Sequence, residues 1–408
     1  MSRYLPQYSE VDHGRRLLSK EPLVYHCNFY NYWLQKTLLL DESLGMAQVI
    51  QDAATEVGFS ILEAAGQALQ PAGSEQKRQL ARDVFADLGF GTGDFSELRE
   101  DGGTVKFPVS HYGGSLRQAS GVDFAVPQSL FDAGYAAAVA AFLFEKPANH
   151  FEGIIELCQS RGAEIGMVVV RPRQSGVVHK SPGLATYKGG QPQAIFESAV
   201  DEPGVLKALA GLDLAGNEEG LIPRFGLMLT NHFANFYNRI SFEFTRKMGE
   251  TDLLDAGEML LTDAGYRCAF HTFGGIMVSA EWDAVVLPQL RTKQDWVHGM
   301  VAVINALGWG VWRVAEISDE RLVVRIWDDY ESCGYLDMYG KSARPVSHLA
   351  AAATAGMMNL VHVGNIANKP ELSVDFYNEV FERDGNFRPE HVRSIAQGDE
   401  YTEIVACR

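Results

Sequence analysis

Residues 25–35 read YHCNFYNYWLQ, and the tetrapeptide at its centre, Asn28-Phe-Tyr-Asn31, returns as Asn235-Phe-Tyr-Asn238. The two tetrapeptides lie 207 positions apart, and at the same offset residues 55–59 (TEVGF) align with residues 262–266 (TDAGY) without a gap. One such similarity has little weight, but two in one register indicate an internal repeat.

Further correspondences extend the repeat when small insertions are allowed. They are Leu88-Gly-Phe-Gly91 with Leu307-Gly-Trp-Gly310, Pro127 with Pro345, Gly134 with Gly356, and Lys146-Pro147 with Lys369-Pro370. We expect a first copy over residues 22–173 and a second over residues 225–408. Residues 1–21 would form an N-terminal arm, and residues 174–224, rich in Gly and Pro, a linker or a lid over a pocket.

Each copy shows the same succession of periodic patterns. Apolar residues at helical spacing predict helices near the Asn-Phe-Tyr-Asn box and over residues 44–69 and 77–88. Residues 312–329 read as two β runs around a polar turn at 318–321, and residues 95–109 match them in the first copy. Helices rich in Ala and Gly follow (130–144 and 349–363), with closing strands at 167–171 and 401–405. The pattern predicts an α+β fold of two duplicated domains, each a small antiparallel sheet with packed helices.

Composition excludes several classes of function. With 408 residues, 46% of them hydrophobic, the chain can bury a large core. Its formal net charge of −17 would repel phosphate groups, so we expect neither nucleic acid nor an anionic membrane as a partner. The start of the sequence lacks a secretory h-region and no apolar run reaches membrane-spanning length, which indicates a cytoplasmic, soluble protein. The five cysteines are scattered and never in CxxC spacing, so neither a disulfide framework nor a structural zinc site is expected.

Differences between the copies point to a site at the repeated box. Tyr25, His26 and Cys27 stand where the second copy has His232, Phe233 and Ala234. Cys27 is the candidate nucleophile, because a thiolate at a helix N-terminus is stabilised by free backbone N–H groups. His26, His111 and His150 are candidates for its base. The alternative is that Cys27 is a buried small apolar residue, since free cysteine is among the most buried residue types.

Two further sets complete the candidate residues. Aromatic rings in the two boxes exceed what one helical face can hide, so part of them would line an apolar pocket with a few polar groups. The expected ligand-binding residues are Tyr25, Asn28, Tyr30, Trp33, His232, Asn235 and Tyr237. His150, Glu152 and Glu156 form a weak candidate metal set, with His150 and Glu152 on one strand face and Glu152 and Glu156 on one helical face. Ordinary surface carboxylates are the alternative for this set.

The order of elements, with a Gly-Trp-Gly turn, a hairpin, a small-residue helix and a Cys-x3-Gly turn before the last strand, resembles the 4-vinyl-reductase-like domain family. The residues that carry the likeness are 89–91, 94–109, 131–134 and 156–162 in the first copy, and 308–329, Gly356 and 394–399 in the second. The resemblance implies a small-molecule-binding domain, and sensor-like members hold zinc around the last turn. Cys158 matches one zinc ligand, but Gly166, Ser394 and Thr402 stand at other ligand positions.

A second likeness concerns the box alone. VYHCNFYNYW resembles the helix-opening box of hotdog-fold acyl-CoA thioesterases, although Lys20-Glu-Pro22 stands where those enzymes carry a catalytic Asp. A hotdog fold would also need long strands after Leu44.

The sequence therefore predicts a protein that binds a small apolar or aromatic molecule and acts on it, most plausibly hydrolytically, through the Cys/His set of the first copy. The alternatives are a non-catalytic protein that binds a hydrophobic metabolite or a tetrapyrrole, and an acyl-CoA thioesterase. No cofactor is required by the sequence, a bound metal ion is compatible with it, and a homodimer is a further expectation.

Overall fold

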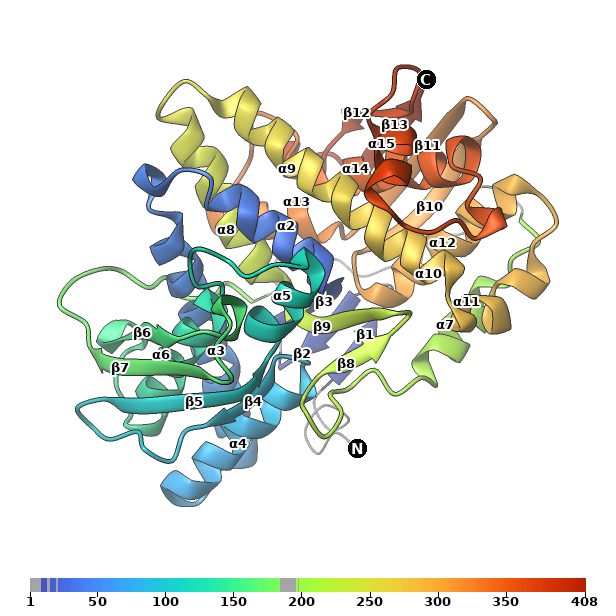
Figure 1. Ribbon diagram of the computed structural model, residues 1–408. Coiled ribbons are helices and arrows are strands. Elements are labelled where there is room, and N and C mark those ends of the chain that lie inside the picture. Colours follow the sequence, from blue (N-terminus) through green and yellow to red (C-terminus); the bar gives the residue numbers. More distant parts are fainter. Residues whose placement is uncertain (1–8, 13–14, 20, 184–195, 197) are drawn as a thin grey trace.

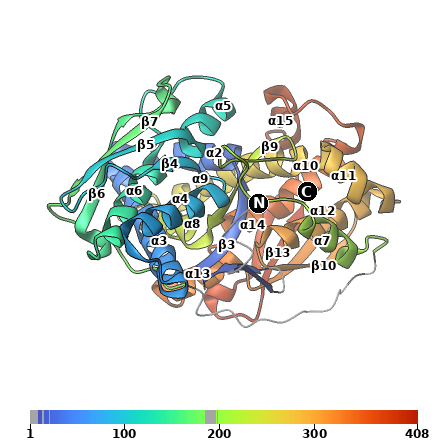
Figure 2. The same ribbon diagram turned by 90° about the horizontal axis from the view of Figure 1, so that it is seen from below.

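The structure is a computed structural model that describes residues 9–12, 15–19, 21–183, 196 and 198–408. In this part of the chain the fold is α+β, with helices packed on antiparallel sheets, as the sequence predicts. Figure 1 shows the N-terminal half (blue to green) beside the C-terminal half (yellow to red), with strands β3 (Glu21–Cys27) and β9 (Leu227–Phe233) between them. Figure 2 shows the same two halves from below.

The first copy runs from a strand through helices to a four-stranded sheet. After β3 its elements are α2 (Asn28–Leu38), η1 (Glu42–Leu44), α3 (Met46–Leu69), α4 (Gly73–Asp87), β4 (Gly91–Asp94), β5 (Gly103–Ser110), η2 (His111–Ser115), α5 (Leu116–Ser120), α6 (Leu130–Leu143), η3 (Ala148–His150), β6 (Phe151–Leu157), η4 (Gln159–Arg161) and β7 (Gly166–Pro172). The sheet has the order β4-β5-β7-β6.

The second copy repeats this order with extra helices. After β9 it contains α8 (Ala234–Gly249), α9 (Leu254–Cys268), η5 (Ala269–Phe273), α10 (Gly274–Val278), α11 (Ala280–Val285), η6 (Leu287–Gln289), α12 (Lys293–Leu307), β10 (Val311–Ile317), β11 (Arg321–Trp327), α13 (Tyr330–Tyr339), α14 (His348–Met358), η7 (Asn359–Val363), η8 (Ile366–Asn368), α15 (Val374–Phe381), β12 (Arg388–Arg393), η9 (Ile395–Gln397) and β13 (Thr402–Cys407). Its sheet order, β10-β11-β13-β12, matches that of the first copy strand for strand. The two copies thus share one topology.

The Gly-x-Gly turns before each sheet explain part of the repeated sequence. Gly89 and Gly308 both have φ +87°, directly after α4 and α12, and Gly91 and Gly310 have φ +114° and +125°. Such backbone conformations favour glycine, because a Cβ atom would collide with the chain. At Gly91 a Cβ would lie 2.2 Å from the carbonyl oxygen of Val109. The motif therefore ends a helix and starts a strand in each copy.

Small residues let the paired helices of each copy approach closely. In the first copy α3 packs on α6, where a Cβ at Gly134 would lie 2.2 Å from the carbonyl oxygen of Gln51. In the second copy α9 packs on α14, where a Cβ at Gly265 would lie 2.6 Å from the Cβ of Ala352. Close approach accounts for the Ala/Gly-rich composition of α6 and α14.

The two copies join through antiparallel pairing of β3 with β9 inside the sheet β1-β2-β3-β9-β8, where β1 is Ser9–Asp12, β2 is Arg15–Leu18 and β8 is Ile222–Arg224. Val24 pairs with His232, and the residues at their equivalent positions, Asn231 and Tyr25, pair with each other. The pairing is therefore symmetric about a local two-fold axis, as in a dimer whose subunits had become one chain.

Two expectations need correction, and one alternative fold loses support. The segment 95–109 does not form two strands, because β4 precedes it and residues 95–102 connect β4 to β5. The stretch after Leu44 is the helix α3, as predicted over residues 44–69, and this argues against the hotdog alternative, which would need strands there. Residues 174–224 contain the helix α7 (Glu202–Ala210), which packs on α12, and the strand β8; residues 184–195 and 197 lie outside the described part. The domain boundaries stay a prediction.

Within the described residues, no helix combines the length and the apolar character that crossing a membrane requires.

Candidate functional site

The repeated boxes lie at the seam between the copies, because each box begins where a seam strand ends. β3 ends at Cys27 and α2 begins at Asn28, while β9 ends at Phe233 and α8 begins at Ala234. Side chains on both sides of these junctions turn inward and meet. They form what we call the central cluster, which consists of His26, Tyr30, Asn31, His111, Tyr112, Thr230, His232, Tyr237, Trp309 and Tyr330, all of them buried.

Hydrogen bonds connect the two copies inside the central cluster. The hydroxyl of Tyr237 donates to Oδ1 of Asn31 at 2.6 Å. Nδ2 of Asn31 lies 2.9 Å from Nε2 of His111, and the hydroxyl of Tyr112 lies 3.0 Å from Nε2 of His232. Each copy therefore supplies groups that the other copy binds.

Aromatic rings surround the histidines. The ring centroid of His26 lies 4.4 Å from that of Tyr30, 4.6 Å from Tyr237 and 4.9 Å from Trp309. The ring of His232 lies 4.6 to 4.8 Å from those of three phenylalanines, which are Phe90, Phe131 and Phe236. The histidines are thus set in an apolar, aromatic environment.

Burial keeps all three histidines neutral at ordinary pH. It lowers the pKa of His26 well below the usual value and that of His111 to about 3. The pKa of His232 is also lowered well below the usual value, first by burial and then by the neighbouring His111 and His26. Nδ1 of His26 and Nδ1 of His111 make no hydrogen bond to any described residue. A buried polar atom without a partner is unusual in a folded protein.

The surroundings of Cys27 do not favour the thiolate prediction. The residue is fully buried, and its Sγ lies 2.9 Å from Oγ1 of Thr272, with no hydrogen bond to a histidine among the described residues. Burial raises the pKa of the Cys27 thiol, the reverse of what a nucleophile at a helix N-terminus needs. The alternative interpretation, a small buried apolar residue, agrees with the structure.

The proposed metal set is not brought together either. His150 ends η3, whereas Glu152 and Glu156 both lie on β6, so the predicted helical face does not exist. Glu152 instead forms an ion pair with Arg171 at 2.8 Å. Across the described part of the chain, no group of three or more His, Cys, Asp and Glu side chains is arranged to hold a metal ion.

The last turns of the two copies are equivalent, as the sequence comparison indicates. Cys158 and Ser394 each precede a short 3-10 helix that ends at a glycine of positive φ. Hydroxyl groups surround both positions. Cys158 lies 2.7 Å from the Ser129 hydroxyl, and the Thr402 hydroxyl donates to Asp329 at 3.0 Å. In the second copy, the hydroxyls of Ser394 and Thr402 stand where the resemblance would place metal ligands.

The predicted ligand-binding residues divide into two groups. Tyr30, His232 and Tyr237 belong to the central cluster. The other four lie around it and contact other residues. Three of them donate hydrogen bonds to backbone carbonyls: Tyr25 to Leu214 at 3.0 Å, Asn28 to Ser115 at 3.1 Å and Asn235 to Gly183 at 2.8 Å. The ring of Trp33 lies 4.7 Å from the guanidinium carbon of Arg267.

Several cluster residues escaped the sequence analysis. Asn31 ends the repeated tetrapeptide, and this repetition is the sequence signal that could have identified it. Tyr112 follows the candidate His111 directly. Trp309 belongs to a motif that was noticed as a turn, and Tyr330 and Thr230 had no signal at all.

Two open grooves lie elsewhere, at equivalent places in the two copies. A first-copy groove of about 500 Å³ is lined by residues that include Leu39, Met46, Val126, Leu130, Ile154 and Arg171. A second-copy groove of about 240 Å³ is lined by Phe242, Tyr335, Tyr339, Arg344 and their neighbours. Both use the turn between the first two long helices of the copy and the segment before the Ala/Gly-rich helix. Neither is lined by residues 25–27.

Comparison with known proteins leaves the family open. No family model matches the chain, and no curated protein matches it. Among solved structures, the phenol-responsive sensory domain of the transcription activator PoxR with phenol is similar at 10% sequence identity and a TM-score of 0.37, covering 51% of this chain and 90% of that one. A likeness this distant leaves the function open as well.

Proposed function

We propose that the protein binds a small molecule in the central cluster and leaves it chemically unchanged. The ligand has an aromatic or other apolar body that contacts the surrounding rings, and it carries at least one hydrogen-bonding group. The observation that supports this proposal is the set of unpartnered polar atoms on His26 and His111, buried among aromatic side chains.

Those atoms make the unliganded cluster energetically costly. A buried donor or acceptor without a partner costs about 1 to 3 kcal/mol, and a ligand that bonds to it removes that cost. Small-molecule sites combine apolar walls with a few polar groups that fix orientation, which describes this cluster. A ligand that binds there has to displace side chains, because the cluster is fully buried.

Hydrolysis is not part of the proposal. The Cys27 thiol is protonated and buried, and its hydrogen-bonded neighbour is Thr272. A nucleophile in this environment is not activated.

The test uses the purified full-length chain. Native mass spectrometry and solvent extraction would reveal a molecule that copurifies, and thermal unfolding would be followed with phenol, acetophenone and toluene as probes. Binding at a ligand concentration ten times the Kd stabilises by about 1.4 kcal/mol, which for a chain of this length raises the Tm by roughly 1 to 2 °C. We expect a Tm increase with phenol or acetophenone that His111→Phe removes and His150→Phe, at a half-exposed residue of η3, retains. The proposal fails if no molecule copurifies and no probe raises the Tm.

The first-copy groove is a second candidate location for the same function. Its volume of about 500 Å³ lies in the range of known ligand sites. Val126 lines it and is 46% exposed, so Val126→Glu would obstruct the groove with little effect on folding. Loss of the probe response in Val126→Glu, and not in His111→Phe, would place the ligand in the groove.

A homodimer and a cytoplasmic location stay predictions.

A further inference from the structure

We infer that Asn31 fixes His111 in the tautomer that carries its proton on Nδ1, so that a ligand of the central cluster has to present a hydrogen-bond acceptor. This inference rests on the proposed function for its ligand and names the chemical class that the site selects. Asn31 is a positioning residue, because it acts through His111.

The orientation of the Asn31 amide is the first step. Tyr237 contacts Oδ1, and since a carbonyl oxygen has no hydrogen, the phenol hydroxyl is the donor in this 2.6 Å contact. Nδ2 also lies 3.5 Å from Oγ1 of Thr230, whose hydroxyl donates to the backbone carbonyl of His26. Thr230 can therefore accept from an amide N–H but has no proton for an amide oxygen. The Thr230 contact favours the NH2 group toward His111 and the carbonyl toward Tyr237, and the Tyr237 hydroxyl, which can donate, is compatible with that orientation.

The tautomer follows from that orientation. Nδ2 of Asn31 donates, so Nε2 of His111 has to accept at 2.9 Å and carries no proton. A neutral imidazole has one N–H, which is then on Nδ1. Nδ1 is buried and has no partner among the described residues. At His111 the free group is thus a donor of fixed position.

The ligand class is set by this donor. A carbonyl, ether or hydroxyl oxygen on an aromatic body would accept from Nδ1–H. A molecule such as indole, which offers only an N–H, would leave that donor unpaired, and sites with an unpaired buried group discriminate strongly.

The second copy lacks this device, which supplies a matched control. The residue equivalent to Asn31 is Asn238, and its Nδ2 donates to the backbone carbonyl of Tyr330 at 3.0 Å. Asn238 therefore orients the backbone, whereas Asn31 orients an imidazole.

The experiment measures the tautomer directly. The full-length chain, labelled with nitrogen-15 in histidine, would be studied at pH 7.5 by long-range proton–nitrogen correlation, with His111→Gln used to assign the His111 signals. We expect the Nδ1–H pattern in the natural protein. In Asn31→Asp the carboxylate accepts from Tyr237 and from His111, so the proton should move to Nε2, while Asn238→Asp should leave the His111 pattern unchanged. An Nε2–H pattern in the natural protein overturns the inference, whatever the variants do.

The ligand class is tested separately with the same proteins. We expect acetophenone to bind at least tenfold more tightly than indole or toluene, and Asn31→Asp to remove that preference. Equal affinities for acetophenone and indole would overturn the assigned class even if the tautomer is as expected. If the Nδ1–H tautomer is found and no probe binds, the proposed function fails while the role of Asn31 stands.

Discussion

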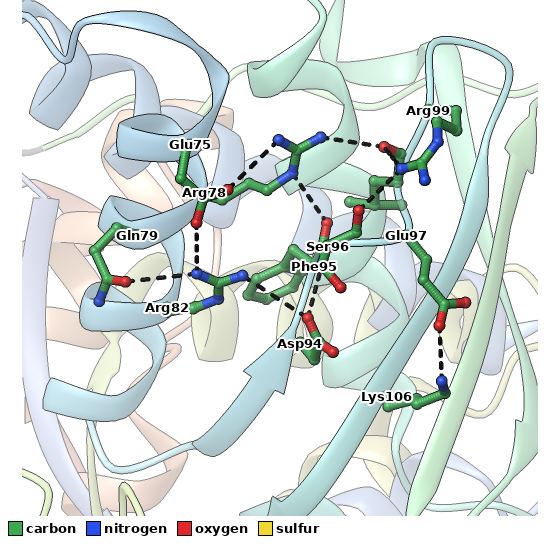
Figure 3. Close-up of polar contacts among 11 residues, drawn as sticks. Glu75, Arg78, Gln79, Arg82, Asp94, Phe95, Ser96, Glu97, Arg99 and Lys106 are labelled. Atoms are coloured by element: carbon green, nitrogen blue, oxygen red, sulfur yellow. Dashed lines mark hydrogen bonds and ion pairs between the residues drawn. The ribbon is translucent and has the colours of Figure 1, made fainter.

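Two networks of charged side chains in this molecule use similar distances but differ in how far water reaches them. Between the copies, Arg239 on α8 donates to both carboxylate oxygens of Glu56 on α3 at 3.0 Å, and the two side chains are only 8% and 2% exposed. On the outside of the first copy, Arg82 on α4 contacts Glu75 at 3.1 Å, with side chains 27% and 72% exposed (Figure 3). The same chemistry has a structural consequence at the seam and little on the surface, because only the buried charge has no water to replace a lost partner.

The largest effect is expected at the seam. Glu56→Ala leaves the Arg239 guanidinium buried with the hydroxyl of Tyr339 as its hydrogen-bond partner. Removing one partner of a buried pair costs about 3 to 5 kcal/mol of unfolding free energy. Urea unfolding followed by circular dichroism at pH 7.5 would measure it. Glu63→Ala is the matched control, since Glu63 lies exposed on the same helix and should change the unfolding free energy by less than about 0.5 kcal/mol.

A loss below about 1 kcal/mol in Glu56→Ala would show that water enters the seam. Two separate unfolding transitions would instead show that each copy folds as a unit and that the Glu56–Arg239 ion pair joins the two copies.

The same difference in burial explains how much the sequence could predict. Helices with a polar face, such as α3 and α4, were predicted to within a few residues, because periodicity records which side meets water. β3 is buried at all seven positions, so it shows no alternation, and its pairing with β9 joins segments some 200 residues apart. The sequence located the candidate site through the repeated box. It could not show that Cys27 lies beneath the surface, since burial depends on what the other copy places on top of it.

A second comparison concerns two buried aspartates near the equivalent last turns. Asp329 accepts hydrogen bonds on Oδ2 from the hydroxyls of Ser347 and Thr402, and on Oδ1 from the backbone N–H of Glu331. Asp132 accepts only from the Ser110 hydroxyl at 2.5 Å, and its Oδ1 has no partner among the described residues. Burial therefore raises the pKa of Asp132 to about 7, and the Ser110 hydrogen bond offsets this only in part.

Asp132→Asn should accordingly change the pH dependence of stability. The unfolded chain releases the Asp132 proton near pH 3.9 and the folded chain near pH 7, so the folded form loses stability as pH rises between these values and is level above them. Between pH 5 and pH 8 the natural protein should lose about 2 to 3 kcal/mol relative to the variant. Urea midpoints at the two pH values give the difference.

Asp329→Asn is the contrasting variant. It can place an NH2 group where the hydroxyls of Ser347 and Thr402 need an acceptor, so it should destabilise the folded protein at both pH values. Parallel pH profiles for Asp132→Asn and the natural protein would mean that water reaches the Asp132 carboxylate. The two aspartates would then not differ in the way described.

The smallest effect is expected in the exposed network of Figure 3. Arg82→Ala removes the contact with Glu75 and a longer one with Asp94 at 3.8 Å, both to well-exposed carboxylates. Exposed pairs contribute about 0 to 1 kcal/mol, and salt screens them, so the loss should stay below about 1 kcal/mol and shrink further in 0.5 M sodium chloride.

Arg78 differs although it lies on the same helix, because its guanidinium donates to the backbone carbonyls of Phe95 and Leu98 and so holds the connection between β4 and β5 on α4. The backbone N–H of Leu98 and the side chain of Arg99 also donate to these carbonyls, but Arg78 is only 14% exposed and its carbonyl partners are uncharged. Arg78→Ala should therefore cost more than Arg82→Ala and keep its effect in salt. If the two variants lose the same stability, the hydrogen bonds from Arg78 to the backbone carbonyls contribute no more than an exposed ion pair. Exposure alone would then account for the difference between the seam and the surface.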